Sequence, residues 1–326
     1  MKAASYRRYG GPEVVELVDL PDPVPGPHEL VVRMSATSIG ASDGAARSGR
    51  PWFARVYFGL RRPKYPVLGW QFVGVVDRVG DAVTRFAVGE RVFGTVASNA
   101  GAHAELILVA EDGVVLPAPD GLADAELAAV IDGALTALPF YREGAQLQAG
   151  QRVLVNGATG VVGVAAVQLA KHYGAHVTAV SRTASLELAR SLGADEVIDF
   201  TSEDFTRNGQ GYDVVFDVAA ASTYSRCRNS LTATGVYLTT VPSFGIFANQ
   251  LLTSRSRGRR AKILFTGLRP GAAIAADLAV VGDLASAGHL VPAIDSRHAL
   301  DSIVEAHRRL DEHGKRGIVL ITAAVA

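Results

Sequence analysis

Apolar and polar positions in the first third of the chain alternate in short runs, separated by glycine and proline. Residues 29–35 and 72–79 have the period of two that is typical of β-strands with one buried face. Helical spacing begins only later, where an alanine- and leucine-rich segment over residues 124–141 predicts a helix. The pattern therefore predicts a β-rich region followed by a region that contains helices.

In the second half of the chain, strands and helices are predicted to alternate. Apolar β-branched runs predict strands, and alanine-rich segments predict helices. The predicted strands cover residues 153–156, 176–180, 213–217, 235–241 and 317–322, and the predicted helices follow residue 160 and cover 273–287 and 299–310. Such alternation is typical of α/β folds with a doubly wound parallel sheet.

Three glycines follow the first of these strands at intervals of three: Gly157, Gly160 and Gly163. Without side chains, Gly157 and Gly160 allow a tight turn and let its backbone N–H groups approach a pyrophosphate. Gly163 lets the following helix pack closely on the strand. A strand, a glycine turn and a helix in this order predict a bound dinucleotide.

The end of the second strand, where the adenosine ribose of a dinucleotide would lie, carries Ser181 and Arg182. An acidic residue at this place accepts hydrogen bonds from the ribose 2′-OH of NAD, whereas a cation and hydroxyls suit a 2′-phosphate. No acidic residue follows until Glu187. This favours NADPH over NADH, although a solvated surface arginine is the alternative interpretation of Arg182.

Composition limits the class of protein. The 326 residues are 48% hydrophobic, and 32 basic residues balance 32 acidic ones, so no net field would attract nucleic acid or an anionic membrane. The single Cys227 excludes an intramolecular disulfide. The N-terminus lacks the apolar core of a signal peptide, and a cytoplasmic enzyme is expected. The basic cluster at 255–262 is interpreted as a solvated loop, with a nucleic-acid or membrane contact as the alternative.

Several further motifs carry a family resemblance. They are Tyr9-Gly10-Gly11-Pro12-Glu13, Asp43 with Arg47-Ser48-Gly49, Pro66-Val67-Leu68-Gly69 before Gly74-Val75-Val76, Val88-Gly89-Glu90-Arg91-Val92, Leu135-Thr136-Ala137 and Leu192-Gly193-Ala194-Asp195. The chain resembles the medium-chain dehydrogenase/reductase superfamily, in its zinc-free quinone oxidoreductase branch. The resemblance implies a GroES-like β-barrel catalytic domain over residues 1–122, completed by about 269–326, and a Rossmann domain over 123–268 that binds NADP(H).

The resemblance also bears on metal binding. Zinc-dependent relatives hold their metal with three side chains, and those positions here are Gly40, Trp70 and Asp132. One carboxylate without His or Cys partners does not make a catalytic zinc site, so no metal is expected. Gln71 replaces the acidic neighbour of the second ligand.

The asparagine that quinone oxidoreductases share near this position is replaced by Gly40. Ser42 aligns with the hydroxyl residue that relays protons in alcohol dehydrogenases. We hypothesise that Ser42, with Asp132, supplies or transmits a proton after hydride transfer. The alternatives are a turn hydroxyl for Ser42 and a structural or surface carboxylate for Asp132.

A substrate pocket is expected from a variable loop over residues 51–58 and its surroundings. Trp52, Tyr57 and Trp70, together with Asp43, are the predicted substrate contacts, because aromatic faces suit a flat quinone or enone. Core packing is the alternative role of the two tryptophans.

The resemblance implies further cofactor contacts. Beside Gly157, Gly160, Ser181 and Arg182, they are Thr136, Ala158, Thr159, Val161, Val162, Phe200, Asp217, Val218, Thr240, Val241, Pro242, Phe265, Thr266 and Lys315. Phe200 stands where many NADPH-using relatives have a tyrosine, so the hydroxyl contact of that tyrosine is lost here. An exposed lysine without a ligand is the alternative interpretation of Lys315.

The leading hypothesis is an NADPH-dependent, zinc-independent oxidoreductase that transfers hydride to a small-molecule acceptor, namely a quinone, enone or aldehyde. The alternatives are a zinc-free NADP-dependent alcohol or ketone oxidoreductase, and a nucleotide-sensing binding protein with little catalysis. A homodimer is expected through an exposed edge strand over residues 261–268.

Overall fold

The computed structural model describes residues 1–96, 101–312 and 314–323, which form two compact units. Unit 1 comprises residues 1–132, 270–286 and 292–326, and unit 2 comprises residues 133–269 and 287–291. Unit 2 is thus inserted into the chain of unit 1. Among the described residues, no helix combines the length and the apolar character that a membrane crossing requires.

Unit 1 is built on a seven-stranded sheet and a two-stranded sheet. The strands are β1 (Lys2–Ser5), β2 (Glu16–Asp19), β3 (Glu29–Ile39), β4 (Gln71–Val79), β5 (Arg91–Thr95), β6 (Leu106–Ala110), β7 (Val114–Pro117), β14 (Ile294–Ala299) and β15 (Ile318–Thr322). The larger sheet has the order β14-β15-β3-β4-β5-β7, and β6 also pairs with β3. Strands from the end of the chain therefore complete the N-terminal sheet.

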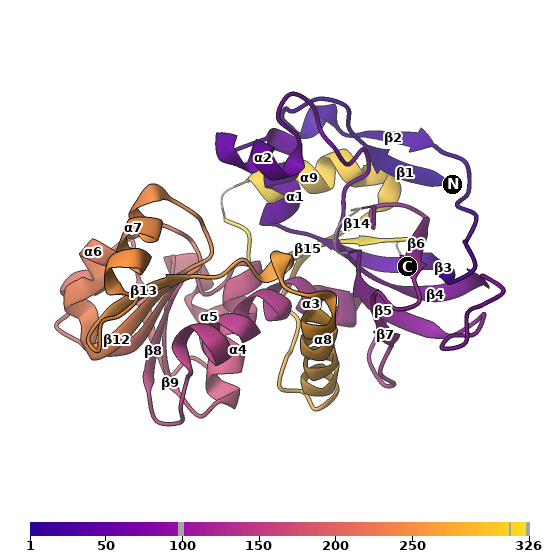
Figure 1. Cartoon of the computed structure of the whole chain (residues 1–326). Helices are drawn as coiled ribbons and strands as arrows, with labels where there is room; N and C mark the ends of the chain where they lie inside the picture. The colour runs from indigo at the N-terminus through magenta and orange to yellow at the C-terminus, as the bar shows by residue number, and fades with distance from the viewer. Residues whose placement is uncertain (97–100, 313, 324–326) are drawn as a thin grey trace. The chain divides into compact units, whose positions relative to one another are not determined.

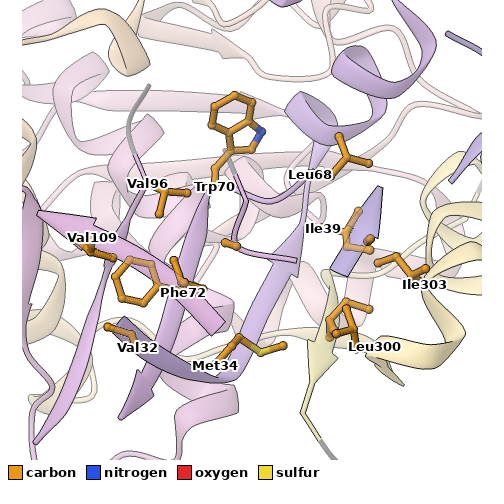
Figure 2. Packing of buried hydrophobic residues seen from close by; sticks show 14 of the residues in the cluster. Val32, Met34, Ile39, Leu68, Trp70, Phe72, Val96, Val109, Leu300 and Ile303 are labelled. Carbon is orange, nitrogen blue, oxygen red and sulfur yellow. The ribbon is translucent and has the colours of Figure 1, made fainter. Parts of the chain in front are cut away.

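The core of unit 1 combines side chains that are far apart in sequence. Met34 and Ile39 from β3, and Leu300 and Ile303 from the C-terminal region, pack in the same buried cluster (Figure 2). The helices of this unit are α1 (Ala41–Ser48), α2 (Arg55–Phe58), α8 (Gly271–Ser286) and α9 (Ile303–Asp311), while α3 (Asp124–Pro139) runs from unit 1 into unit 2.

An ion pair between the buried Arg47 and the exposed Asp311 joins α1 to α9, which lie side by side in Figure 1. The guanidinium of Arg47 donates two hydrogen bonds, of 2.8 and 2.6 Å, to the Asp311 carboxylate, and a further one to the backbone oxygen of His307. Both bonds to the carboxylate come from the one nitrogen Nη2, and charge-assisted hydrogen bonds of this kind are stronger than neutral ones. The position of α1, which begins at the candidate active site, thus depends on the C-terminal helix.

Unit 2 contains a fully parallel sheet of six strands. They are β8 (Arg152–Asn156), β9 (His176–Ser181), β10 (Glu196–Asp199), β11 (Tyr212–Asp217), β12 (Leu231–Thr239) and β13 (Arg260–Ile263). Their order, β10-β9-β8-β11-β12-β13, is the 3-2-1-4-5-6 order of a Rossmann sheet. The helices are α4 (Val161–His172), α5 (Leu186–Ser191), α6 (Tyr224–Cys227) and α7 (Phe244–Thr253). In such sheets, ligands bind beyond the carboxyl ends of the strands.

Most predicted elements are confirmed within a few residues, and three differ. The helix predicted over 124–141 is α3, followed by a π-helical turn over Phe140–Ala145. The variable loop predicted over 51–58 forms two short helical turns, Trp52–Ala54 and α2. The edge strand predicted over 261–268 is β13, which ends at Ile263, and residues 266–268 form a 3₁₀ turn. Short helical turns escape periodicity analysis because they hold too few residues.

Candidate active site and nucleotide-binding segments

In unit 1, the end of β3 and the start of α1 are held by the buried carboxylate of Asp43. One oxygen accepts a hydrogen bond from the N–H of Gly40 at 2.9 Å, and the other accepts one from the N–H of Gly69 at 3.1 Å. Burial raises the pKa of Asp43, and His103 and the two N–H groups oppose this. Because both oxygens bond to the backbone in the interior, the predicted substrate contact of Asp43 is wrong, and the residue is structural.

The predicted catalytic residues Ser42 and Asp132 lie beside the same glycine. A Cβ atom built on Gly40 would lie 2.4 Å from Oδ2 of Asp132 and 3.8 Å from Oγ of Ser42. Gln71, at the start of β4, donates a hydrogen bond of 3.1 Å from Nε2 to Oδ1 of Asp132. The fold therefore gathers α1, β4 and α3 around one carboxyl group.

Asp132 has the titration behaviour of a proton donor near neutral pH. Burial, and secondly the charge of Asp43, raise its pKa from 3.8 to about 7. The side chain still keeps partial contact with solvent. A carboxyl group that is half protonated near pH 7 can act as a general acid. The catalytic role of Asp132 stays a prediction.

The aromatic residues predicted at the substrate pocket separate into two groups. Trp70 is buried, and its ring lies 6.0 Å from those of Phe58 and Tyr65, while Tyr57 contacts both of these residues. The indole N–H of Trp70 has no hydrogen-bond partner among the described residues. Trp52 is 71% exposed. Tyr57 and Trp70 thus belong to one aromatic cluster, and Trp52 lies outside it.

In unit 2, the glycine turn has the geometry of a phosphate-binding loop. Gly157 has φ +87°, which only glycine adopts without strain, and a Cβ on Gly163 would lie 2.1 Å from the backbone oxygen of Gly157. A Cβ on Gly160, at the N-cap of α4, would meet nothing closer than 3.6 Å. The side of Gly160 is therefore open to a ligand, and the following N–H groups of Val161 and Val162 start the helix.

Two predicted cofactor contacts within and beyond this turn have buried side chains. Ala158 is fully buried, and its N–H donates to the backbone oxygen of Val180. Asp217, at the end of β11, is also fully buried, and its carboxylate accepts hydrogen bonds from Asn156, Tyr237 and the N–H of Ser222. The backbone of Ala158 thus ties the turn to the end of β9, and the carboxylate of Asp217 holds the segment that follows β11. Val218 follows Asp217 and stays partly exposed.

The end of β9 combines hydroxyls with a cation, as predicted, but an acidic residue lies nearby. Ser181 and Thr159 are buried and share a hydrogen bond of 2.9 Å that ties the turn to β9. Arg182 is partly exposed. Asp199, at the end of the adjacent β10, accepts hydrogen bonds from the hydroxyls of Thr183 and Thr201, and Phe200 is exposed beside it.

Five further predicted cofactor residues of unit 2 follow strand ends at the same edge of the sheet. Thr240, Val241 and Pro242 come directly after β12, and Phe265 and Thr266 come after β13. The ring of Phe265 stacks on that of Phe247 in α7, with centroids 6.2 Å apart. Thr136 lies on α3 and is partly exposed.

Lys315 belongs to unit 1 and has a structural role. Its Nζ donates hydrogen bonds to the backbone oxygens of Leu310 and Glu312, and burial lowers its pKa. The lysine therefore caps the end of α9, and its predicted cofactor contact stays a prediction.

Sequence reasoning did not assign roles to several residues of these sites. In the sequence, Gln71 only replaces an acidic residue of the zinc-dependent relatives, and no pattern marks Tyr65. Asp199 lies 17 residues after Arg182, too far along the chain for the sequence to connect the two. Gly133 was also missed: a Cβ there would lie 2.3 Å from the backbone oxygen of Val161, so this glycine lets α3 approach the start of α4. Its place in the middle of a predicted helix, where glycine is costly, was the available signal.

Two family models match the chain: the alcohol dehydrogenase GroES-like domain over residues 26–120, and the zinc-binding dehydrogenase domain over residues 192–321. The quinone oxidoreductase of Pseudomonas aeruginosa is 34% identical over 251 residues, which cover 75% of this chain and 73% of that protein. The 2-methylene-furan-3-one reductase of Solanum lycopersicum is 35% identical over 229 residues, which cover 67% and 56%. The quinone oxidoreductase structure from Coxiella burnetii has a TM-score of 0.87 and 25% identity, and covers 99% of both chains.

The zinc that the second family model implies does not fit the residues of this chain. Positions 40, 70 and 132 supply a glycine, a tryptophan and one carboxylate, and the described residues contain no group of three metal-ligating side chains. A nicotinamide cofactor does fit, because the open side of Gly160 stands at a helix N-terminus beyond the carboxyl edge of a Rossmann sheet. The chain is therefore an oxidoreductase of the medium-chain dehydrogenase/reductase superfamily, in its quinone oxidoreductase-like branch.

Proposed function

We propose that this protein is an NADPH-dependent, zinc-independent reductase of quinones and α,β-unsaturated carbonyl compounds. The observation that carries the proposal is the Asp132 carboxyl, whose pKa is raised to about 7 beside Gln71 and Ser42. Reduction of a conjugated carbonyl needs a proton at the substrate, and these residues can supply it without a metal. The names of two relatives, a quinone oxidoreductase and a 2-methylene-furan-3-one reductase, support the same acceptor class.

When bound, the cofactor supplies the hydride. In this chain, Asp132 and Ser42 hold and pass the proton, and the cluster of Tyr57, Phe58, Tyr65 and Trp70 offers an apolar wall for a flat acceptor. Thr136, the predicted nicotinamide contact, lies on α3.

Turnover by EDTA-treated protein tests the proposal. NADPH and NADH oxidation would be measured with a naphthoquinone, an enone, an alkenal and a simple ketone. We expect NADPH oxidation with the conjugated acceptors, a loss of kcat of about 100-fold in Asp132→Asn and a smaller loss in Ser42→Ala. The exposed Asp120→Asn is the matched control. Turnover with the ketone alone would favour the alcohol or ketone oxidoreductase, and tight binding without turnover would favour the nucleotide sensor.

The preference for NADPH is proposed from Arg182 at the end of β9. A charge-assisted hydrogen bond to the 2′-phosphate contributes about 1.5–3 kcal/mol. Arg182→Ala is therefore expected to raise the KM for NADPH at least about 10-fold while the KM for NADH changes less than about 2-fold. Arg207→Ala, which removes an exposed arginine of the same unit, is the control. Equal changes for both cofactors would refute the preference, and Asp199 would then be the ribose contact.

A homodimer is proposed on the apolar surface around the edge strand β13. Phe244 is 87% exposed, Leu251 and Leu252 are exposed on α7, and Phe265 and Leu268 follow β13. An unpaired strand edge beside exposed apolar side chains favours pairing with a second copy. Leu252→Glu should yield monomers in sedimentation velocity, whereas Leu60→Glu, at a similarly exposed leucine of unit 1, should not. A wild-type monomer at micromolar concentration would contradict the proposal.

A further inference from the structure

The backbone conformation of Gly40 does not require a glycine. Its φ of −118° and ψ of −177° are extended values that any residue adopts. A Cβ at this position would nevertheless lie 2.4 Å from Oδ2 of Asp132 and 3.5 Å from the carboxyl carbon. The Asp132 carboxyl therefore occupies the space that a side chain at position 40 would fill.

The two oxygens of this carboxyl differ in their surroundings. Oδ1 accepts the hydrogen bond from Nε2 of Gln71, which is buried at the start of β4. The backbone oxygen of Gln71 in turn accepts a hydrogen bond from the hydroxyl of Thr37 in β3. Oδ2 lies against Gly40, on the side of Ser42. An acceptor oxygen that already receives a donor is the poorer place for the acid proton, so the proton belongs on Oδ2.

We propose that Oδ2 of Asp132 delivers the proton in the reduction, that Gln71 is the positioning residue that orients it, and that Gly40 provides the space it needs. This inference rests on the proposed function and assigns its proton to one atom. Gln71 acts through Asp132, whereas Gly40 acts by having no side chain.

The reduction balances with this assignment. A hydride supplied by a nicotinamide cofactor would form a C–H bond at the β-carbon of an enone, and the π electrons of the C=C bond would move toward the carbonyl oxygen. The O–H bond of Oδ2 then breaks, and its proton joins the developing enolate. Asp132 is left as a carboxylate and regains a proton from water, so the substrate has gained two electrons and two hydrogens while the cofactor is oxidised.

Exchanging the two side chains is the sharpest test. Gly40→Asn should lower kcat at least about 30-fold, because its side chain collides with Asp132, and Asp132→Ala should lower kcat by about 100-fold. In the double variant, the amide of the introduced asparagine enters the vacated space and offers an N–H donor. We expect the double variant to recover at least about 10-fold over Asp132→Ala, a departure from additivity that unrelated sites do not show.

A glycine control separates the contact from a general effect on folding. Gly40→Ala, whose Cβ would also meet Oδ2 at 2.4 Å, should lower kcat, whereas Gly271→Ala in the same unit, with no neighbour closer than 3.9 Å, should not. Thermal unfolding of every variant reports whether the fold is kept.

The pH profile tests Gln71. A proton donor must be protonated, so wild-type kcat should fall as pH rises through about 7, the pKa of Asp132. The titratable group that acts on it is Asp43, from α1, while Gln71 and Ser42 are neutral. Gln71→Leu removes a hydrogen bond to the carboxylate and should move this descending limb to higher pH while kcat falls. A purely structural role would not move it.

The outcomes separate the inference from the proposed function. An inactive wild type with every conjugated acceptor would refute both. If the wild type is active, any one of three results would refute the inference alone. They are full activity in Gly40→Ala, no recovery of kcat in the double variant, and an unchanged descending limb of the pH profile in Gln71→Leu.

Discussion

The Asp132 carboxyl should lower the free energy of unfolding at neutral pH, and Asp132→Asn should raise it. In the wild type, burial and the charge of Asp43 raise the pKa of the carboxyl from 3.8 to about 7. The folded state therefore favours the neutral form. The stability that this preference gives is complete at low pH, is lost as pH rises from about 4 to 7, and is absent above pH 7. Asparagine carries no charge at any of these values and keeps an oxygen for Gln71.

The magnitude follows from the two pKa values. At about 1.4 kcal/mol for each tenfold change in proton concentration, the difference between 3.8 and about 7 corresponds to about 4 kcal/mol. Asp132 keeps partial contact with solvent, which lowers the expected effect to about 2 kcal/mol. The unfolding free energy of the variant, compared with that of the wild type, should therefore rise by about 2 kcal/mol from about pH 4.5 to pH 8.5. Its loss of activity should be largest below pH 7, where Asp132 of the wild type is protonated.

Urea denaturation followed by tryptophan fluorescence measures this difference. Trp70 is buried in the same unit as Asp132 and reports its unfolding, whereas the exposed Trp52 contributes a nearly constant signal. The unfolding free energies of both proteins would be compared at several pH values, with Asp120→Asn as the control at an exposed carboxylate. A difference that does not grow with pH would show that the carboxyl is ionised in the folded protein, and the proton-donor argument would fail.

The glycine turn offers a matched pair of variants. Gly163→Ala should destabilise the protein by at least about 2 kcal/mol, because its Cβ would lie 2.1 Å from the oxygen of Gly157. Gly160→Ala should keep the melting temperature within about 2 °C and weaken NADPH binding at least about 10-fold. Calorimetry of folding and of binding tests both, and an equal loss of stability would refute the distinction. Lys315→Ala should leave the Kd for NADPH within about 2-fold and lower the melting temperature, because the lysine caps α9; a roughly 10-fold weaker Kd would restore it as a cofactor contact.

The Rossmann half of the fold could be predicted from the sequence because its signals are local. The strand before Gly157, the glycines and the following helix are continuous in the chain, and hydrophobic period identifies each of them. The motifs and the resemblance extended the prediction to both domains, and the matching families confirm the fold class. The return of the chain to unit 1 came from the resemblance alone, since no periodic signal pairs β15 with β3.

The site was harder to predict because it depends on which side chains meet. Ser42 and Asp132 were named as candidates, but the contact between Asp132 and Gly40 joins residues 92 positions apart, and no pattern marks it. The roles of Asp43 and Lys315 could not be predicted for a related reason. The sequence around a charged residue is the same whether its side chain faces a ligand or bonds to the backbone. Only its burial and its hydrogen-bond partners distinguish the two roles.

The insertion of unit 2 into unit 1 sets the order in which the protein can be completed. All but five residues of unit 2 are continuous from residue 133 to 269, so its parallel sheet is complete on the growing chain before the last strands of unit 1 exist. The N-terminal sheet must wait for β15 to cover β3, and Arg47 must wait for Asp311. A truncation or frameshift near the C-terminus would therefore remove the ion-pair partner of the helix that carries Ser42, although that helix begins at residue 41.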